Sequence, residues 1–417
     1  MTNQTVRVGI AGTKFSGFYQ QWSYKQVAGI DVQLVGVTSG SPENAKAFAQ
    51  KYGVQQAYPS FPEMLDKADL DVVSLCVPNS LHGPFAIEAA EKGVKVVVVE
   101  KPMTIWPGYV EGRKASAEQK KIETMQYASE ILDTFDRTGS KMLYAENFVY
   151  MPGVLSAIQT FREGGGHIID IEGECSHWGS HATYYDKIHL SGGGALISKT
   201  VHPLGTALYA KYCEGIFRND EPIRPASVFA MASQIMKTMP KEAQKNFVVM
   251  QHVEDWSLLL VKFEDGTIAQ LKGTDTYLAG IKNTVEIRAT NEIYRIDVNP
   301  NNHTTCFTLA SETLKGLELR EKQRHNAGWS NPSIEEYRLN GYVNELTDAV
   351  KCALDKQHMP QSGALLAFDT MAIVGAAYES VEIEKWVDIS DFISARKFDG
   401  KYYPNFDYVE PIFRTKN

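Results

Sequence analysis

The segment Val94-Lys95-Val96-Val97-Val98-Val99-Glu100-Lys101-Pro102 decides the fold. Its near-continuous valine run, 94–99, is typical of a strand that is buried on both faces in a parallel sheet. Such a strand delivers the following residues to the carboxyl edge of the sheet, where open α/β folds bind ligands. Pro102 cannot continue the strand, so Glu100 and Lys101 are two charges at that edge. A solvated strand end would look the same, and only the upstream sequence separates the two interpretations.

Upstream, the apolar strand 6–11 leads into the turn Gly12-Thr13-Lys14-Phe15-Ser16-Gly17 and then into a helical stretch. This is a variant of the G-x-G-x-x-G dinucleotide fingerprint in which Lys14 replaces the middle glycine. Gly12 would allow the tight turn and Gly17 the close packing of helix on strand, while Lys14 could meet a phosphate as a point charge. We therefore predict cofactor contacts for Gly12, Thr13, Lys14, Phe15 and Gly17. A purely structural turn is the alternative.

The second strand, 32–37, ends in Thr38-Ser39-Gly40-Ser41, and the first acid after it is Glu43. Rossmann folds that prefer NAD usually place a carboxylate at this strand end, where it accepts hydrogen bonds from the ribose 2′-hydroxyl. A hydroxyl-rich turn does not repel a 2′-phosphate. The sequence therefore predicts an NAD(P) cofactor with a slight lean to NADP, contacted by Ser39. The run Ser41-Pro42-Glu43 can equally be the start of a helix, with Ser41 as its cap.

A third buried strand, 72–77, leads into Pro78-Asn79-Ser80-Leu81-His82, and a helix over 83–92 then precedes the valine strand. Alternating strands and helices at this spacing predict right-handed βαβ units and a parallel sheet. Residues 1–145 are thus predicted to form a doubly wound, dinucleotide-binding Rossmann domain. The residues predicted to bind cofactor after the third and fourth strands are Pro78, Asn79, His82, Glu100 and Lys101.

Four runs in this order resemble the Gfo/Idh/MocA oxidoreductase family, which includes glucose–fructose oxidoreductase and inositol dehydrogenase. They are V-G-I-A-G-T (8–13), V-P-N-S-L-H (77–82), E-K-P (100–102) and S-G-G-G-A-L-I-S-K-T-V-H (191–202). The resemblance implies that Lys101 hydrogen-bonds the nicotinamide ribose and the reacting hydroxyl. It also implies that His202, the histidine of the family's D-x-x-x-H pattern, accepts the proton. Ser198 stands where that pattern has aspartate, and Lys199 offers a second cation.

These two residue types suit alcohol oxidation. Hydride transfer from an alcohol carbon requires that charge on the oxygen be stabilised, and a fixed ammonium beside it contributes about 3 kcal/mol in a water-poor site. The proton needs an acceptor whose pKa lies near neutrality, as that of histidine does. Lys101 and His202 are therefore the predicted catalytic residues.

Several other residues are candidates for substrate binding, on less specific sequence signals. By strand alternation, 143–148 places Glu146 or Asn147 near the pocket, and a polar aromatic cluster precedes the glycine run (His177, Trp178, His181, Tyr184, Tyr185). The predicted substrate-binding residues are Asn147, His181, Tyr184, Ser198, Lys199 and His202. Trp329 could contribute similarly. Buried core aromatics with exposed histidines are the alternative, and we predict no metal site, because no third ligand has convincing spacing near His177 and His181.

Composition limits the class of protein. The chain has 417 residues, enough for two domains, and is 43% hydrophobic without any apolar run near twenty residues, which predicts a soluble protein. No charged-then-apolar segment precedes the first strand, so we expect a cytoplasmic location. Five scattered cysteines without C-x-x-C spacing predict reduced thiols. The net charge of −8 argues against nucleic acid as a partner, and no membrane partner is expected.

The second half, 146–417, is predicted to be an α+β domain for substrate binding and oligomerisation, with a large, open, mostly antiparallel sheet. Residues 167–178 alternate as a half-exposed strand, and Asp265-Gly266 marks a hairpin between 257–264 and 267–273. Two late helices, near 333–356 and 364–385, are expected to pack back on the body. The exposed face of such a sheet often pairs with another subunit, so we predict a homo-oligomer, either a dimer or a tetramer.

The sequence thus predicts an NAD(P)-dependent oxidoreductase, a dehydrogenase or reductase acting on CH–OH groups. It would transfer a hydride between the nicotinamide and a hydroxyl or keto carbon of a sugar, polyol or sugar acid. Two alternatives stay open: an NAD-using glycosidase or epimerase of the same fold, and a non-catalytic regulator that senses cofactor or sugar.

Overall fold

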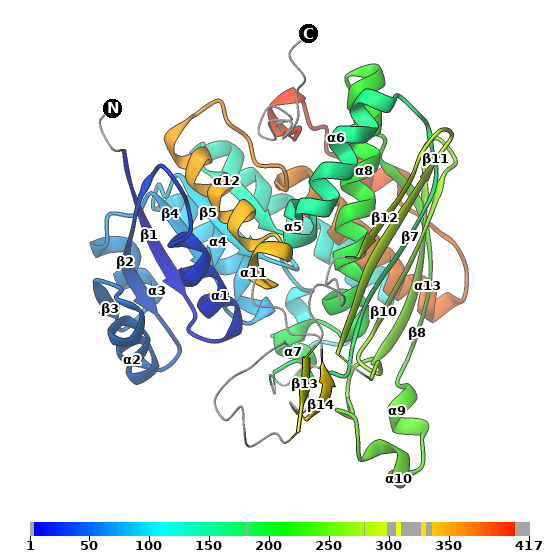
Figure 1. Ribbon diagram of the computed structural model, residues 1–417, viewed down its shortest axis with the longest axis horizontal. Helices are drawn as coiled ribbons and strands as arrows, with labels where there is room; N and C mark the ends of the chain where they lie inside the picture. Colours follow the sequence, from blue (N-terminus) through cyan, green and yellow to red (C-terminus); the bar gives the residue numbers. More distant parts are fainter. Residues whose placement is uncertain are drawn as a thin grey trace.

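The molecule is built around two β-sheets that lie side by side, shown at the left and right of Figure 1. The computed structural model describes residues 4–179, 182, 184–278, 280–297, 306–309, 327–330 and 336–404. We call the N-terminal sheet, β1–β6, sheet A, and the larger C-terminal sheet, β7–β12 with β15, sheet B.

Sheet A has six parallel strands in the order β3-β2-β1-β4-β5-β6. The strands are β1 (Thr5–Ala11), β2 (Asp31–Thr38), β3 (Gln56–Tyr58), β4 (Val72–Leu75), β5 (Val96–Glu100) and β6 (Lys141–Ala145). The four valines of β5 are fully buried, as expected of a strand covered on both faces. The strand order reverses direction between β1 and β4, which is where doubly wound folds bind ligands. The prediction of a Rossmann fold is confirmed.

The helices of this half connect successive strands and carry the predicted end signals. They are α1 (Phe15–Tyr24), α2 (Pro42–Tyr52), α3 (Phe61–Lys67), α4 (His82–Glu91) and α5 (Ala117–Thr138). Ser41 caps α2 by accepting the Asn44 N–H at 3.3 Å, and Gly53 ends it in the left-handed conformation. The segment Ser41-Pro42-Glu43 is therefore a helix start, as the sequence allowed.

Sheet B is mixed but mostly antiparallel, as predicted. Its order is β12-β11-β7-β10-β9-β8-β15, and within it only β7 and β10 pair in parallel among the described residues. The strands are β7 (Ile168–His177), β8 (Pro225–Ser233), β9 (Trp256–Phe263), β10 (Ile268–Thr274), β11 (Ile281–Ala289), β12 (Ile293–Asp297) and β15 (Val387–Asp388). The predicted hairpin joins β9 to β10, with Gly266 at φ 88°. A separate two-stranded sheet pairs β13 (Cys306–Thr308) with β14 (Gly328–Ser330).

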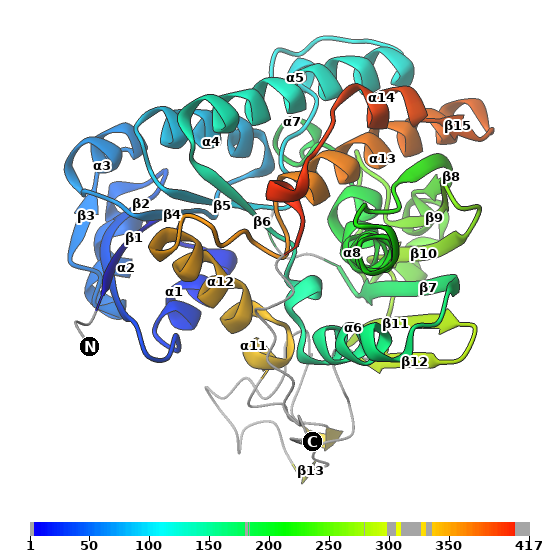
Figure 2. The ribbon, with the colours of Figure 1, turned by 90° about the horizontal axis from the view of Figure 1, so that it is seen from above.

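Three helices cover the inner face of sheet B: α6 (Pro152–Gly164), α8 (Val201–Asn219) and α13 (Ala364–Ile383). Helix α13 also packs along α5, so it lies between the two halves of the molecule (Figure 2). By length and composition α13 could cross a membrane, a feature that the sequence analysis did not single out. However, 78% of its most apolar window is buried inside the protein, as in the core helix of a globular fold. Five further helices are short: α7 (Ile188–Ser191), α9 (Ile235–Thr238), α10 (Lys241–Gln244), α11 (Glu336–Leu339) and α14 (Ser390–Ala395).

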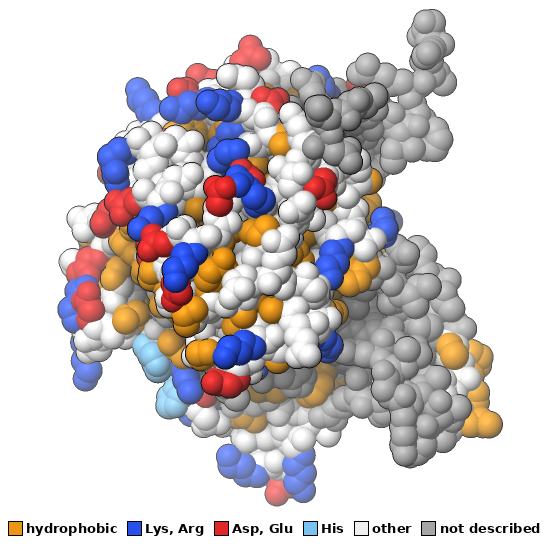
Figure 3. All heavy atoms as spheres, turned by 90° about the vertical axis from the view of Figure 1, so that its left-hand side faces the viewer, with side chains coloured by type: hydrophobic (Ala, Val, Ile, Leu, Met, Phe, Trp, Pro, Cys, Tyr) orange, Lys and Arg blue, Asp and Glu red, His pale blue; other side chains and the backbone are white. Residues whose placement is uncertain are grey.

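The sheet A side of the molecule and the outer face of sheet B both carry positive and negative side chains. Figure 3 views the sheet A side, where lysine, arginine, aspartate and glutamate side chains are interspersed over the described surface. The outer face of sheet B carries a ladder of ion pairs, in which Glu174 lies between Lys272 and Lys282, and Arg288 contacts Asp170 and Glu172. The prediction that another subunit covers this face is tested by sedimentation of the purified protein, where a monomeric mass would contradict it.

Helix α12 (Tyr342–Leu354) comes from the C-terminal part of the chain but packs on sheet A. In Figure 2 it lies on the same side of the sheet as α1, opposite α3, α4 and α5. It contacts β1, β4, β5 and β6 and so covers the part of this face that the connecting helices leave open. The helix predicted over 333–356 is interrupted at Gly341, whose φ is 84°. A Cβ there would meet the Asn147 carbonyl oxygen at 2.3 Å, so only glycine fits this approach.

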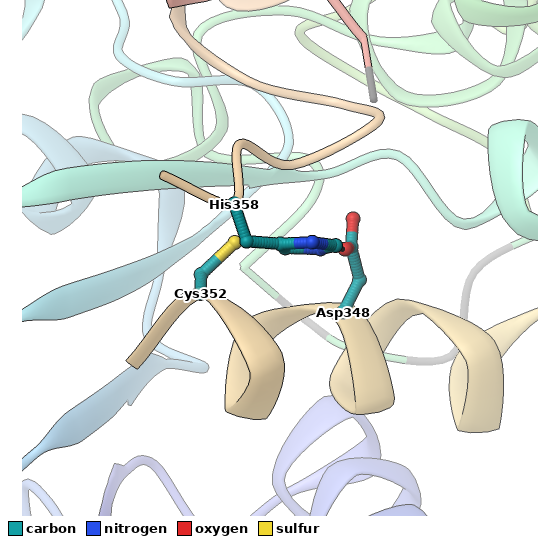
Figure 4. Close-up of side chains that lie close together, drawn as sticks. All are labelled: Asp348, Cys352 and His358. Atoms are coloured by element: carbon teal, nitrogen blue, oxygen red, sulfur yellow. Dashed lines mark hydrogen bonds and ion pairs between the residues drawn. The ribbon is translucent and has the colours of Figure 1, made fainter. Parts of the chain in front are cut away.

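A buried polar network fixes the end of α12 (Figure 4). Asp348 accepts hydrogen bonds from the Tyr150 hydroxyl at 2.8 Å and the Gln361 N–H at 2.8 Å, and its other oxygen lies 2.6 Å from His358 Nε2. Asp348, Cys352 and His358 have the proximity of metal ligands. Burial raises the pKa of the Cys352 thiol well above its usual value, and a thiol must lose its proton to bind a metal. We therefore interpret the cluster as a hydrogen-bonded joint between α12 and the 3₁₀ turn after β6.

Lys141 strengthens the same joint from β6. Its ammonium donates to the carbonyls of Cys352, Asp355 and His358 at 2.9, 2.6 and 2.8 Å. A cation that satisfies the last carbonyls of a helix also complements the helix dipole. A metal ion placed beside Asp348 would be repelled by this charge, which further favours the structural interpretation.

Burial of the Glu345 carboxyl group in α12 lowers the stability of the folded protein. It is fully buried, and neither of its carboxylate oxygens has a hydrogen-bond partner among the described residues. Burial, and then the nearby Glu100, Glu146 and Asp348, raise its pKa well above the ordinary value. Because the folded state holds this proton more tightly than the unfolded state, stability is lost as pH rises above the unfolded value of about 4.3.

We therefore expect Glu345→Gln to raise the melting temperature by a few degrees at pH 8, because the amide is neutral and needs no proton uptake on folding. The gain should vanish as the pH approaches 4. Thermal melts of both proteins between pH 4.5 and pH 8 measure this, and Glu130→Gln on the exposed side of α5 is the control. A variant that melts lower than the parent at pH 8 would show that the carboxylate is stabilising there.

Candidate active site

The turn after β1 has the shape of a phosphate cradle. Gly12 has φ 110°, and a Cβ there would meet the Cys76 carbonyl oxygen at 1.9 Å, so the position requires glycine. A Cβ on Gly17 would meet the Gly12 carbonyl oxygen at 2.3 Å, because α1 packs directly against the turn. Both glycines have the structural roles predicted for them. The Thr13 hydroxyl donates to the Ser39 hydroxyl at 3.2 Å and so joins the ends of β1 and β2.

The N-terminus of α1 fits an anionic group. The helices α2, α3 and α5 are each capped by a serine side chain, whereas Lys14 at the same position of α1 makes no such hydrogen bond. The first turn of α1 has no acidic residue, and Lys14 and Phe15 are exposed there. Uncapped N–H groups and a lysine are what a pyrophosphate needs. These residues fit the phosphates of a dinucleotide.

The segment after β4 supports the neighbouring loops. His82 is buried, with Nδ1 2.7 Å from the Pro102 carbonyl oxygen and Nε2 2.9 Å from that of Val77. Burial lowers its pKa to about 4, so the ring is neutral and donates to one of these carbonyls. Asn79 donates to the Ser191 carbonyl at 2.7 Å and so ties the glycine run to sheet A. Both residues position the site, and contact with a cofactor stays a prediction for them and for the half-buried Pro78.

Lys101 reaches from the end of β5 into the second half of the chain. Its ammonium donates to the main-chain carbonyl of Ser198 at 2.8 Å. Glu100 lies beside it and accepts a hydrogen bond from the Gln20 amide at 2.9 Å. Burial raises the pKa of Glu100, although the charge of Lys101 acts in the opposite direction. The amine is thus fixed at the junction of the two sheets.

A π-helical turn, Leu196–Thr200, presents that carbonyl. The i→i+5 pattern would pair the Ser198 carbonyl with residue 203, and Pro203 has no N–H, so Lys101 can take that place. Glu254 holds the turn by accepting the N–H groups of Gly194 and Leu196 at 2.9 and 3.0 Å. The Ser198 hydroxyl is used within the turn, where it donates to the Gly194 carbonyl at 2.7 Å. The π turn therefore changes the helical phase between residues 198 and 202 from that of a regular α-helix.

His202 follows the π turn and forms a dyad with Glu146. Its Nδ1 lies 2.8 Å from Glu146 Oε1, and its ring stacks on Phe148 with centroids 4.8 Å apart. Burial lowers the pKa of His202 well below its usual value, helped by the charges of Lys101 and Lys199. Burial raises the pKa of Glu146 well above its usual value. Both partners are therefore uncharged, and with Nδ1–H donating to Glu146 Oε1 the lone pair of Nε2 is left to take up a proton.

Lys199 is buried beside an acid that the sequence analysis missed. Its ammonium lies 3.4 Å from Asp275 Oδ1 and 5.3 Å from the centroid of the Tyr185 ring. Burial lowers the pKa of Lys199, but the charge of Asp275 and the other neighbours outweigh it, so the net pKa is raised. The Lys199–Asp275 pair is thus a charged lysine and a carboxylate with little exposure to water.

The other predicted substrate residues are spread more widely. Asn147 is buried and donates to the Asn340 carbonyl at 2.6 Å, which supports the start of α12. Tyr184 stacks on Tyr185 at 4.4 Å, next to Lys199. Trp329 is 74% exposed on β14, where it packs on Phe307. His181 lies outside the described residues.

Asp275 and Glu254 are the residues that sequence reasoning did not single out. A signal for Asp275 existed, because it follows the alternating strand 267–273 after one intervening residue, just as Lys101 follows the valine run 94–99. No comparable signal marked Glu254, whose role depends on a contact between distant segments.

The chain is similar to known oxidoreductases in part of its sequence and in its fold. The profile of an oxidoreductase family, Gfo/Idh/MocA, described as having an NAD-binding Rossmann fold, matches residues 6–127. Among solved structures, GenD2 from gentamicin A biosynthesis in complex with NAD is 21% identical, with a TM-score of 0.74 over 92% of this chain and 96% of that one. A scyllo-inositol dehydrogenase from Lactobacillus casei with bound NAD(H) and scyllo-inositol gives 0.68 over 93% and 100%, at 17% identity. At these identities the structures establish the fold alone.

Sequence relatives agree. Levoglucosan dehydrogenase of Pseudarthrobacter phenanthrenivorans is 23% identical over 65% of this chain and 68% of its own length. D-glucoside 3-dehydrogenase of Escherichia coli is 27% identical over 50% and 55%. The first relatives are thus matched over 55–68% of their own length. The match over residues 6–127 confirms the resemblance to the Gfo/Idh/MocA oxidoreductase family that the motifs indicated for the N-terminal part of the chain.

Proposed function

We propose that the protein is an NAD(P)-dependent oxidoreductase that acts on a CH–OH or keto carbon of a sugar, polyol or sugar acid. The observation that carries the proposal is the Lys101 ammonium, held 2.8 Å from the Ser198 carbonyl, with the His202–Glu146 dyad following in the same segment. The relatives named as levoglucosan and D-glucoside dehydrogenases support this substrate class.

Each group has a role in the proposed reaction. A bound nicotinamide would accept or supply the hydride, and the residues that would hold the dinucleotide are Gly12, Thr13, Lys14 and Ser39 with the N-terminus of α1. Lys101 would donate to the reacting oxygen and stabilise the charge that develops on it. His202 would take the hydroxyl proton at Nε2 during oxidation and return it during reduction. Glu146 would fix the tautomer of His202 through Nδ1.

The test is a screen of sugars, inositols and sugar acids with NAD⁺ and NADP⁺, followed by the absorbance of the reduced nicotinamide. The proposal expects steady-state formation of reduced cofactor with at least one member of these classes. A chain that binds dinucleotide yet turns over none of them in either direction would contradict it.

Cofactor preference gives a sharper prediction. The first acid after β2, Glu43, accepts the Ser41 hydroxyl at 2.8 Å within the start of α2, and Ser39 accepts the Thr13 hydroxyl at 3.2 Å. We propose that NADP is tolerated and slightly preferred. Ser39→Asp should then lower kcat/KM for NADPH by about tenfold or more, because a carboxylate repels the 2′-phosphate. Comparing NADPH with NADH in both proteins measures this, and a parent protein that prefers NADH tenfold would contradict it.

A second candidate function has one observation in its favour. An α-N-acetylgalactosaminidase of Shewanella oneidensis is 25% identical over 39% of this chain and 32% of its own length. A glycosidase that uses bound NAD would release a leaving group from a glycoside without net formation of reduced cofactor. Assaying release of nitrophenol from nitrophenyl glycosides together with cofactor absorbance separates the two functions.

A further inference from the structure

Asp275 and His177 lie together because β7 and β10 of sheet B pair in parallel. Strands β7 and β10 run in the same direction, and Thr274 of β10 is level with Ser176 of β7. The next residue on each strand, Asp275 and His177, therefore emerges at the same carboxyl edge. His177 Nδ1 lies 3.7 Å from Asp275 Oδ1. This edge of sheet B is the one on which the π turn rests.

Gly273 allows the π turn to lie directly on β10. A Cβ on Gly273 would meet Thr200 Oγ1 at 2.3 Å and Lys199 Cβ at 2.9 Å. The close approach places Lys199 over the strand end, with its ammonium 3.4 Å from Asp275 Oδ1. The same turn presents the Ser198 carbonyl to Lys101, so the ion pair and the proposed catalytic lysine share one scaffold.

The Lys199–Asp275 pair is buried, and its two histidine neighbours are slightly more exposed. Lys199 and Asp275 expose 5% and 2% of their side chains, while the flanking His177 and His202 expose 12% and 13%. Asp275 Oδ1 has only long contacts, to the Lys199 ammonium at 3.4 Å and to His177 Nδ1 at 3.7 Å, and no short hydrogen bond among the described residues. A buried carboxylate oxygen with such weak contacts is costly, and a hydroxyl group is a donor that would satisfy it. Lys199 can donate to a neighbouring hydroxyl, and the Tyr184–Tyr185 stack next to it offers an apolar face of the kind that packs on sugar rings.

The charges around His202 cancel in pairs. Lys199 is balanced by Asp275, and the His202–Glu146 dyad is neutral overall. Lys101 supplies the remaining positive charge of this group, and the proposed function assigns it to the reacting oxygen. In this group of residues no further cation is left to balance a carboxylate on the substrate.

We propose that Lys199 and Asp275 form a charge-neutral subsite that binds hydroxyl groups of an uncharged sugar or polyol and selects against sugar acids. This rests on the proposed function and narrows its substrate class. Asp275 then determines specificity through its charge as well as through a hydrogen bond.

The experiment compares matched neutral and acidic probes: methyl β-D-glucoside with methyl β-D-glucuronide, and the corresponding galactoside pair. Asp275→Asn should lower the ratio of neutral to acidic kcat/KM by about tenfold or more, because it leaves the charge of Lys199 unbalanced. Lys199→Gln should change the ratio in the opposite direction, so either variant alone tests the proposal if the other fails to fold. Asp265→Asn is the matched control, since Asp265 pairs with Lys211 at 2.7 Å at the far end of β10.

Calorimetric Kd values for the same probes separate this proposal from the proposed function. Charge-dependent binding without turnover by the parent protein would refute the oxidoreductase and support the subsite. Turnover with a ratio that stays within threefold in both variants would refute the subsite and leave the oxidoreductase standing. Failure of the parent protein to bind any probe of either pair would also overturn the subsite.

Discussion

Replacing Lys101 by methionine should lower kcat/KM by about a hundredfold or more, while the Kd for the cofactor changes little. Methionine keeps much of the length of the side chain but cannot donate to an oxygen. The ammonium is positioned by the end of β5 and by the Ser198 carbonyl at 2.8 Å, so its loss removes a donor that is already in place. Steady-state kinetics with the best substrate of the sugar screen, and cofactor titration by fluorescence, measure the two quantities.

Lys95→Met is the matched control for this variant. Lys95 precedes the same strand at its opposite end, where its side chain is 60% exposed and pairs with Asp71 at 2.8 Å. Its replacement should leave kcat/KM within about twofold, because an exposed ion pair contributes little. If Lys101→Met kept most of its activity, the assignment of Lys101 as the group that acts on the reacting oxygen would be refuted.

The second large effect is expected at His202. His202→Asn should lower kcat/KM for oxidation by about 10²- to 10⁴-fold, because asparagine can contact Glu146 but cannot take up the proton. The exposed His189→Asn on α7 is the control and should behave as the parent. Loss of activity without loss of cofactor binding distinguishes a chemical role from a folding defect. Retained activity of the His202→Asn variant would show that another group accepts the proton.

The pH profile of the parent enzyme tests the same dyad. Burial and two nearby lysines lower the pKa of His202, so the imidazole stays neutral, and able to accept a proton, below pH 6.5. The acidic limb of kcat/KM for oxidation should therefore lie well below that pH. If the acidic limb of kcat/KM lies at or above pH 6.5 and is retained in His202→Asn, the limb reports the titration of another group.

Much of this structure was predictable because local patterns agree with the global fold. The valine run before Glu100 predicted a strand buried on both faces of a parallel sheet, which is β5 of sheet A. The glycines at 12 and 17 have the steric roles that the dinucleotide fingerprint requires. The hairpin at Asp265-Gly266 and the mixed sheet followed from alternation and turn chemistry. These features depend on neighbouring residues, which a single sequence displays.

The remaining features depend on contacts between distant segments. Nothing local shows that Pro203 leaves the Ser198 carbonyl for Lys101, or that a π turn changes the phase before His202. Asp275 lies beside Lys199 because the π turn packs on Gly273 of β10, which comes more than seventy residues later in the chain. Asn147, expected in the pocket by alternation, turns instead to the Asn340 carbonyl, because the strand ends at Ala145 and a 3₁₀ turn follows.

Helix α12 also bears on how this protein can be dissected. A fragment ending near residue 330 would contain every strand of the Rossmann half, yet it would lack the cover over β4, β5 and β6. The apolar surface left bare would invite aggregation, so the nucleotide-binding half is not a module that can be excised at a single cut or grafted whole onto another chain.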